Sequence, residues 1–505
     1  MPDYQSPGVY IETVDSGSRP IEGVGTAVAA FVGFASKGPS EPTLVTSWTQ
    51  YTASFGESFA GGLLAHAVYG FFLNGGSACY VVRIGGDGAA PAPAPQAMLG
   101  SFRIVAKELP EGDGGDISVE VSELPQAEGE QSQEERFAIK VKRDGKVEET
   151  FEFPPKSGKG TLATAVRQSK LIKVEEAGAE LAKLEPQAVT LTAPPPAPVL
   201  PAKVTPDVYM GNEEQRSGVS GLAAVDEVTM IAIPDLMGAF EQGAITADEV
   251  KSVQGQLVAH CANLQDRMAI LDAPPGLTAA DLKKWNEGLG LKSMWATLYH
   301  PWIKVFEPQR GMRLIPPSGH IAGVWARNDA TRGVHKAPAN EVIHGAIVLE
   351  SQLTHGEQNL INPTGVNCIR VMPGRGIRVW GARTLADASE KQWQYLNVRR
   401  LFNYLRESIL EGTQWVVFEP NDDALWARIR RTIAAFLVME WRKGALFGLT
   451  PDEAFYVKCD RETNPAESIS RGMVVCEIGV APVKPAEFVI FRLAQMASGT
   501  SLVSE

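Results

Sequence analysis

The sequence predicts an α/β fold with a mostly parallel sheet, interrupted by a mostly β insertion and followed by an α+β C-terminal region. The first observation is that strand patterns alternate with helix patterns, as in Val228–Ile233, Val250–Leu264 and Met268–Leu271. This alternation favours parallel pairing. The second is a pair of Pro/Ala tracts, 85–95 and 194–201, that bracket a segment of different character. The third is a helical repeat of apolar residues in the C-terminal third.

The central α/β domain is expected to be discontinuous in sequence, formed by residues 23–86 and 206–355. The mostly apolar run Val228–Ile233, which ends at Pro234, is typical of a buried strand. The two strand patterns that precede the insertion could join the same sheet as those that follow it. Besides the elements above, we expect a helix at Leu282–Leu289 and strands at Ala27–Phe34, Cys79–Ile84 and Met294–Leu298.

The insertion is predicted at residues 87–205, as a small β domain on two proline-rich linkers. Alternating apolar and polar residues at Phe102–Val105 and Ile117–Val121 are typical of half-buried strands. Asp144-Gly145 lies between two further strand patterns and is a hairpin signal. Pro/Ala tracts are semi-rigid and do not enter packed elements, so they act as spacers. We expect the insertion to face outward, and the sequence leaves its role open.

Two helices are expected in the C-terminal domain, residues 356–483. The first extends from Tyr395 to Gly412, and the second extends over residues 421–443. On the second helix, apolar residues fall on one arc of the helical wheel, and three arginines cluster on the other side. Such a basic face is either an ordinary solvated surface or a docking surface for an acidic partner, and the pattern leaves both open. The apolar arc is Leu425, Ile429, Ile433, Phe436 and Leu437, and the basic residues are Arg428, Arg431, Arg442 and then Lys443.

The two chain ends contain strand patterns that have no hairpin partner nearby. Gly8–Val14 lies in a predicted N-terminal arm, residues 1–22, and Phe488–Leu493 lies in a C-terminal arm, residues 484–505. Their backbone N–H and C=O groups need a ladder, which the sheet of a neighbouring copy can supply. Pairing within the same subunit is the alternative, and both remain open here. The residues expected to form intermolecular strands are Val9, Tyr10, Ile11, Glu12, Thr13, Val14, Phe488, Val489, Ile490 and Phe491.

Composition and charge restrict the function classes. The 505 residues are 44% hydrophobic and 21% charged, which is ordinary for globular domains with buried cores. A formal net charge of −12 argues against a general nucleic-acid binder, because such proteins depend on many Lys and Arg contacts with phosphates. The five cysteines have no paired spacing, which indicates neither a zinc cluster nor a disulfide framework. We also expect no export signal and no membrane insertion.

No motif predicts a catalytic, cofactor or metal site. The sequence has no G-x-S-x-G elbow, no Walker phosphate loop and no H-E-x-x-H pair. Asp272, His300 and Ser318 occur in an order that a serine hydrolase could use, but order alone is weak evidence in a long chain. Asp235 and Asp272 follow predicted strand ends, where sites in parallel sheets often form. Structural capping is the simpler role for both.

Short motifs follow one another along the chain, outside the insertion. The N-terminal motifs are PGVYIE at 7–12, GTAVAAFVGFASKG at 25–38 and FLNGG at 72–76. The later motifs include PPSGHIAGVWARND at 316–329, GVHKAPAN at 333–340, WGARTL at 380–385, VRRLF at 398–402, FEPN at 418–421 and PVKPAEF at 482–488. In this order they resemble the tail-sheath proteins of contractile phages and related injection systems. The resemblance covers nearly all of the chain except about residues 87–205.

This resemblance implies a structural subunit and not an enzyme. Subunits of that family polymerise as stacked six-membered rings around an inner tube, and the sheath contracts to drive the tube through a target envelope. Their terminal arms add strands to sheets of neighbouring subunits, and 8–14 and 488–493 are the matching positions here. The α/β domain is then expected to be a subtilisin-like fold without its active site. A C-terminal helix of the family contacts the tube, and the basic face of 421–443 is the candidate.

The resemblance also implies partners and a place of assembly. Besides further copies of the chain, the partners would be the inner tube protein and the baseplate and terminal cap proteins. Assembly is expected in the cytoplasm of the producing cell, as the sheath of a phage tail or a tail-like injection particle. Two other interpretations remain at this point. One is a hydrolase on the subtilisin-like scaffold, and the other is a shell protein that does not contract.

Overall fold

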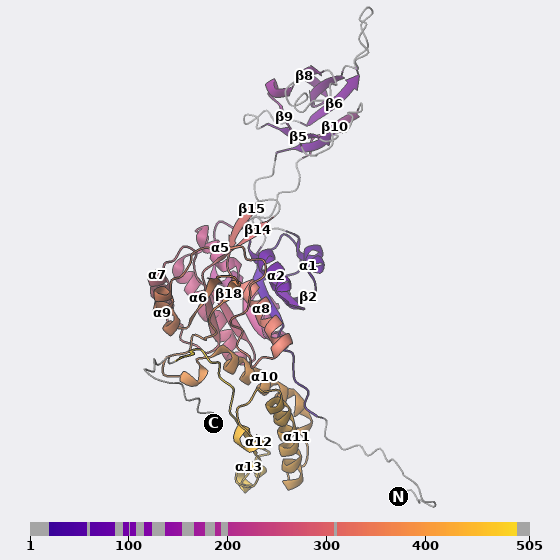
Figure 1. The fold of residues 1–505 in the computed structure, drawn as a ribbon. Helices are drawn as coiled ribbons and strands as arrows, with labels where there is room; N and C mark the ends of the chain where they lie inside the picture. The colour runs from indigo at the N-terminus through magenta and orange to yellow at the C-terminus, as the bar shows by residue number, and fades with distance from the viewer. Residues whose placement is uncertain are drawn as a thin grey trace, which may run out of the picture. The chain divides into compact units, whose positions relative to one another are not determined.

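The computed structural model describes residues 20–57, 61–85, 94–99, 102–107, 116–123, 137–153, 166–176, 187–192, 200–307 and 311–491. The chain divides into two compact units (Figure 1). The larger unit combines Met1–Gly86 with Leu200–Glu505, and the smaller unit is Asp87–Val199. Across the described residues, no helix combines the length and the apolar character needed to cross a membrane.

An eight-stranded sheet forms the centre of the larger unit. Its six inner strands pair in parallel, and one antiparallel strand closes each edge. The mostly parallel sheet predicted from the sequence is therefore confirmed, including the two strands that precede the insertion. The spatial order is β18 (Gly376–Val379), β17 (Val366–Met372), β13 (Ala296–His300), β12 (Met268–Asp272), β11 (Met230–Ala232), β1 (Ala29–Gly33), β3 (Cys79–Arg83) and β2 (Thr43–Val45).

Helices pack over this sheet and bury its strands. Two of them begin three residues before the predicted helices, because Thr246 and Thr278 cap their first turns through side-chain oxygens. Helices α2 and α8 approach closely, since a Cβ atom on Gly319 would lie 2.3 Å from the Cα atom of Ala67. The helices are α1 (Trp48–Phe55), α2 (Leu64–Leu73), α4 (Pro206–Met210), α5 (Asp235–Glu241), α6 (Ala247–Leu264), α7 (Ala279–Leu289), α8 (Ser318–Arg332) and α9 (His355–Ile361).

The C-terminal part has a core of its own between two long helices. The predicted apolar arc of the second helix is confirmed, because all five of its residues are buried. They pack with Leu401 and Leu405 of the first helix, and Ile21 from the N-terminal side joins the same core. The elements are α10 (Leu396–Gly412), α11 (Asp423–Arg442), α12 (Pro451–Ala454), β19 (Phe455–Lys458), α13 (Ala466–Ser470) and β20 (Glu477–Val480).

The central sheet extends beyond the domain boundary predicted at residue 356. Strand β17 pairs in parallel with β13, and β18 continues the sheet as its edge. The strand pattern of β17 could have predicted this extension of the sheet, because its first four residues are all buried. A small sheet also belongs to this unit, in the order β15 (Gly311–Ile315), β14 (Ile303–Glu307) and β16 (Val348–Leu349).

The smaller unit consists of two antiparallel sheets around one apolar core. Asp144 and Gly145 join β7 to β8 with φ values of 50° and 79°, which is the left-handed backbone expected for a tight hairpin. The core includes Ile104, Val119 and Ile139. One sheet has the order β10 (Gln187–Thr190), β6 (Ile117–Glu123), β7 (Phe137–Arg143) and β8 (Lys146–Phe153), and the other has β4 (Gln96–Leu99), β5 (Phe102–Ala106) and β9 (Ile172–Glu176).

Candidate functional site

The order Asp272, His300, Ser318 does not produce a catalytic triad. Ser318 Oγ donates to Asp272 Oδ2 at 2.5 Å, so the carboxylate binds the serine in place of an imidazole. All three side chains are buried. Neither ring nitrogen of His300 has a hydrogen-bond partner among the described residues, and burial lowers the pKa of His300 to about 4. Because a serine nucleophile needs an adjacent base, this arrangement gives no support to the hydrolase alternative.

Asp235 and Asp272 cap helices at the carboxyl ends of central strands. Asp235 accepts hydrogen bonds from the N–H groups at the start of α2 and, at 2.6 Å, from the Phe34 N–H. Asp272 accepts from the Ser318 N–H at 3.2 Å, at the start of α8. The first N–H groups of a helix have no partner within the helix, and carboxylates satisfy them well. The structural role predicted for both residues is confirmed.

Asp272 should give the stability of the fold a measurable pH dependence. Burial raises its pKa to about 7, although the hydrogen bonds from Ser318 act in the opposite direction. The folded state then holds this proton more tightly than the unfolded state, so stability falls as the pH rises from about 5 to 8. Relative to Asp272→Asn, the wild-type protein should lose about 2–3 kcal/mol of unfolding free energy over that range. Denaturant titrations at several pH values measure this difference.

The comparison with Asp272→Asn is needed because buried histidines titrate in an overlapping range. Burial lowers the pKa of His260 and His300 to about 4 and that of His320 to about 3. Each of them therefore destabilises the fold as the pH falls below the ordinary histidine value of about 6.5. Their contributions cancel between the two proteins. A difference that stays constant from pH 5 to 8 would contradict the raised pKa of Asp272.

Helical spacing predicts that Arg399 and Arg400 point away from the apolar side of α10, but the structure buries both side chains. Arg400 forms an ion pair with Asp329 of α8 at 2.6 Å, and both side chains are only 3% exposed. The guanidinium carbon of Arg399 lies 4.3 Å from the ring centroids of both Trp295 and Trp393. Paired and stacked guanidinium groups have definite geometry. They fasten α10 to the central α/β part, which helical spacing alone did not indicate.

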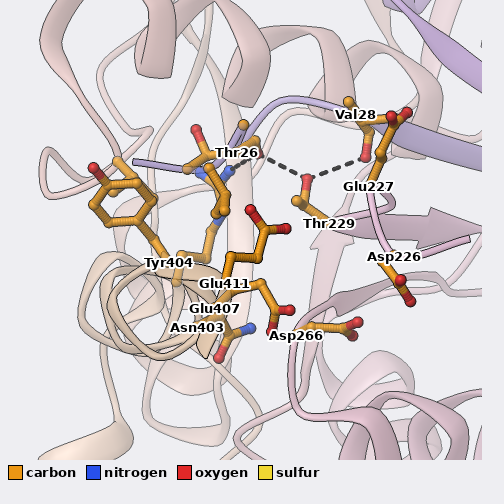
Figure 2. A pocket seen from close by; sticks show the side chains of 14 residues that line it. Thr26, Val28, Asp226, Glu227, Thr229, Asp266, Asn403, Tyr404, Glu407 and Glu411 are labelled. Carbon is orange, nitrogen blue, oxygen red and sulfur yellow. Dashed lines mark hydrogen bonds between the residues drawn. The ribbon is translucent and has the colours of Figure 1, made fainter. Parts of the chain in front are cut away.

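An acidic pocket of about 330 Å³ lies where α10 meets the strands of the central sheet (Figure 2). Thr229 Oγ1 donates to the carbonyl oxygens of Thr26 and Val28, at 2.8 and 3.0 Å. Burial raises the pKa of Glu407, and neighbouring carboxylates add to this effect. Among the described residues no three metal-ligating side chains are grouped to hold an ion, and we assign this pocket no ligand. Its carboxylates are Asp226, Glu227, Asp266, Glu407 and Glu411.

The exposed side of α11 carries the four basic residues predicted to meet a partner. Arg428 pairs with Glu419 at 2.7 Å, and Lys443 pairs with a glutamate one turn earlier, also at 2.7 Å. Arg431 and Arg442 are exposed, and neither has an ion-pair partner among the residues that the structure describes. Two of the four cations are thus already neutralised within the chain, and two are available to an outside partner.

Strands β19 and β20 form an antiparallel sheet of two strands. Tyr456 lies opposite Gly479, and a Cβ atom on this glycine would be 2.1 Å from the tyrosine ring, so the glycine makes room for the ring. Within the described chain neither strand pairs with a third strand, and each therefore keeps one open edge. Two-stranded sheets are marginal in water unless something extends or covers them.

The chain that follows β20 is held against the central part at Glu487. Its carboxylate accepts two hydrogen bonds from Arg383, at 2.7 and 2.8 Å, one from Asn362 at 3.1 Å and one from Tyr395 at 3.0 Å. Burial raises the pKa of Glu487, but these bonds outweigh burial and lower it overall. A bidentate pair of this kind fixes orientation as well as position. We call these four residues the Glu487 anchor.

Beyond the anchor the chain is exposed. Residues 488–491, within the predicted C-terminal strand, belong to no strand and have side chains exposed by 72, 67, 79 and 86%. Four consecutive large apolar residues in water form a surface that favours association. Residues 492–493 of this prediction, and the whole N-terminal strand at 8–14, lie outside the described residues. The intermolecular role of both segments stays a prediction.

The described residues form an α/β fold that exposes the basic side of α11 and the apolar segment 488–491. Two family models match the chain. The phage tail sheath protein central domain covers residues 222–385, and the phage tail sheath C-terminal domain covers residues 388–495. Together they account for more than half of the sequence. The chain belongs to the phage tail sheath family, whose members are structural proteins and not enzymes.

Known relatives agree with this assignment. The tail sheath protein of Burkholderia phage BcepMu is 26% identical over 363 residues, which are 66% of this chain and 74% of that protein. The tail sheath protein of Vibrio phage KVP40 is 24% identical over 275 residues, which span 49% of this chain but only 40% of that protein. Among solved structures, the PVC sheath complex of an extracellular contractile injection system, in its contracted state, has a similar fold. Its TM-score is 0.60 at 21% identity, covering 98% of this chain and 99% of that chain.

Proposed function

We propose that this chain is the subunit of a contractile sheath, which polymerises around an inner tube and shortens to drive the tube through a target envelope. Family membership and the fold support this role. The observation that carries the proposal is the exposed apolar segment 488–491, which leaves the subunit from a fixed anchor. A monomer gains nothing from such an end, whereas a polymer can use it to link adjacent copies.

The arms, residues 1–22 and 484–505, are proposed to add strands to the β19–β20 sheet of neighbouring copies. That sheet has two open edges, so one arm on each side would extend it to four strands. A backbone ladder keeps copies linked while they rotate, and side-chain interfaces repack between two discrete arrangements. The expected polymer is a stack of six-membered rings, assembled in the cytoplasm on a baseplate and closed by a terminal cap.

The central α/β domain is interpreted as a subtilisin-like scaffold that has no active site. Asp272 and Ser318 are residue types that a hydrolase could use for catalysis. Here they bind each other and hold the start of α8. Differences in interface free energy, added over many copies, would then drive contraction without a nucleotide. The insertion, residues 87–205, is proposed to face outward, where its mass would block neither the tube nor the arms.

The basic side of α11 is proposed to face the tube. The free guanidinium groups of Arg431 and Arg442 would attract an acidic tube surface at long range, and salt would weaken this attraction. Arg428 and Lys443 would contribute less, because each is already paired within the chain. Contacts between exposed charges break readily, which suits a surface that must release the tube during contraction.

Replacing both free arginines should weaken assembly on the tube. We expect Arg431→Glu with Arg442→Glu to reduce co-sedimentation with tubes at least about tenfold at low salt, with a smaller effect at high salt. Self-polymerisation of the variant without tubes should be unchanged. The control is Lys283→Glu with Lys284→Glu on α7, which changes the net charge equally. Equal losses in the two variants, or no loss in either, would count against a tube-facing α11.

Electron microscopy of the purified chain tests the proposed function directly. Hollow cylinders with a short helical repeat, and their assembly along added tubes, would support a sheath. Closed shells would support the non-contracting alternative. A protein that stays monomeric at all concentrations, with residues 488–491 protected from proteolysis, would contradict both the polymer and its linking arms.

A further inference from the structure

The ends of β19 and β20 bring two of the five cysteines together. The strand register pairs Lys458 with Glu477, so its continuation by one residue sets Cys459 opposite Cys476. Opposed residues of an antiparallel pair have Cα atoms about 4.5–5.5 Å apart, which lies within the range that disulfides span. Both cysteines are free, and each thiol is close enough to affect the pKa of the other.

Asn464 holds this pair in place from the connecting segment. Its side-chain oxygen accepts from the Val475 N–H at 2.6 Å, and its amide nitrogen donates to the Val475 carbonyl oxygen at 2.9 Å. The same nitrogen lies 3.8 Å from Cys459 Sγ. Asn464 is 1% exposed, so this bridge is a buried part of the local fold. Both backbone groups of Val475, the residue before Cys476, are therefore hydrogen-bonded. This limits the conformational freedom of the Cys476 thiol.

The two thiols differ in their access to solvent. Cys459 is fully buried, whereas Cys476 is half-buried at the end of β20. A soluble oxidant can therefore reach Cys476 first, and Cys459 lies behind it as the resolving thiol. The other three cysteines, Cys79, Cys261 and Cys368, are each 0% exposed in the central core.

We propose that Cys459 and Cys476 are a redox site that closes to a disulfide once the protein meets small-molecule disulfides such as oxidised glutathione. The Cys476 thiolate attacks one sulfur of the small disulfide and releases one small thiolate. Cys459 then attacks the Cys476 sulfur of the mixed disulfide and releases the second. The net reaction oxidises two protein thiols and reduces one small disulfide to two thiols, and the two protein protons pass to the products.

Closure should be slow at neutral pH. Burial raises the pKa of Cys459, and burial together with its neighbour raises the pKa of Cys476 to about 12, so little thiolate is present. A reducing cytoplasm would keep the pair open, and an oxidising exterior would close it over time. If the proposed function holds, the disulfide would form after the particles are released from the cell. It would then cross-link β19 to β20 in a sheet to which the arms of neighbouring copies have already added their strands.

The experiment treats the intact, reduced chain with oxidised glutathione under native conditions and then blocks free thiols. We expect a mass 2 Da below that of the reduced protein before blocking, and a cross-linked peptide joining Cys459 to Cys476. Hydrogen exchange of residues 455–480 should slow on the order of 100-fold, as expected for a loop closed by a disulfide. The buried Cys79, Cys261 and Cys368 should react only after denaturation.

Two variants keep the test decisive. Cys476→Ser should abolish both the cross-link and the added protection, and Cys459→Ser should stop at a stable glutathione adduct on Cys476. A wild-type protein that retains this adduct, shows no reaction at Cys476, or cross-links only after unfolding would overturn the proposal. These readouts use the soluble subunit, so a failure to polymerise would argue against the sheath function and leave the redox result standing.

Discussion

Deletion of residues 1–16 should yield a folded subunit that no longer forms cylinders. The expected loss is large because, under the proposed strand exchange, each arm strand would contribute several backbone hydrogen bonds to a neighbour. About four such bonds at roughly 1 kcal/mol each correspond to a 1,000-fold rise in the critical concentration. Sedimentation and electron microscopy over a range of protein concentrations measure this change. The melting temperature of the subunit should stay within about 1 °C of the wild-type value.

The structure supplies a matched control for this deletion. Ile21 is buried against α10, where a Cβ atom on Gly412 would lie 2.5 Å from its Cγ1 atom, and the Val24 N–H donates to Ser408 Oγ at 3.1 Å. Deletion of residues 1–22 removes Ile21 as well and should cost the fold about 2–4 kcal/mol. Normal cylinders from the shorter deletion would disprove the role of the N-terminal arm.

Much of the fold could be predicted because the signals are local. The runs at Ala29–Gly33, Met268–Asp272 and Ala296–His300 are apolar enough to read as buried parallel strands. The periodicity of α11 located its buried face and its basic face. Asp144-Gly145 predicted a hairpin through turn chemistry alone. In each case neighbours in sequence decide the structure, and the tertiary context agrees with them.

The contacts between distant segments could not be predicted in this way. Arg399 and Arg400 looked like polar positions of an amphipathic helix, and only the placement of Trp295, Trp393 and Asp329 makes them buried partners. The Glu487 anchor joins residues 362, 383 and 395 to the last described segment. The facing cysteines, Cys459 and Cys476, lie 17 positions apart in sequence, and only the register of β19 against β20 sets them opposite each other. A single sequence contains no local pattern that predicts which distant residues will be in contact.

Glu487→Gln should weaken polymerisation while leaving the subunit folded. The substitution keeps the shape of the side chain but removes the charge that accepts two hydrogen bonds from Arg383. Hydrogen bonds to charged groups contribute about 1.5–3 kcal/mol, so the exit point of the C-terminal arm would no longer be fixed. A less restricted arm has a lower effective concentration at the neighbouring sheet. We expect the critical concentration to rise about 10- to 100-fold, measured by sedimentation.

The specific signature of the anchor is non-additivity. Arg383→Gln should produce a similar assembly defect, and the double variant should be no worse than either single variant, because both remove the same pair. Arg471→Gln is the control, since it breaks an exposed ion pair with Glu467 on α13 and should leave assembly unchanged. If the defects at 383 and 487 instead add, the two residues act independently. The arm would then be positioned by the strands it joins in the neighbouring copy, and the anchor would serve only the fold of its own subunit.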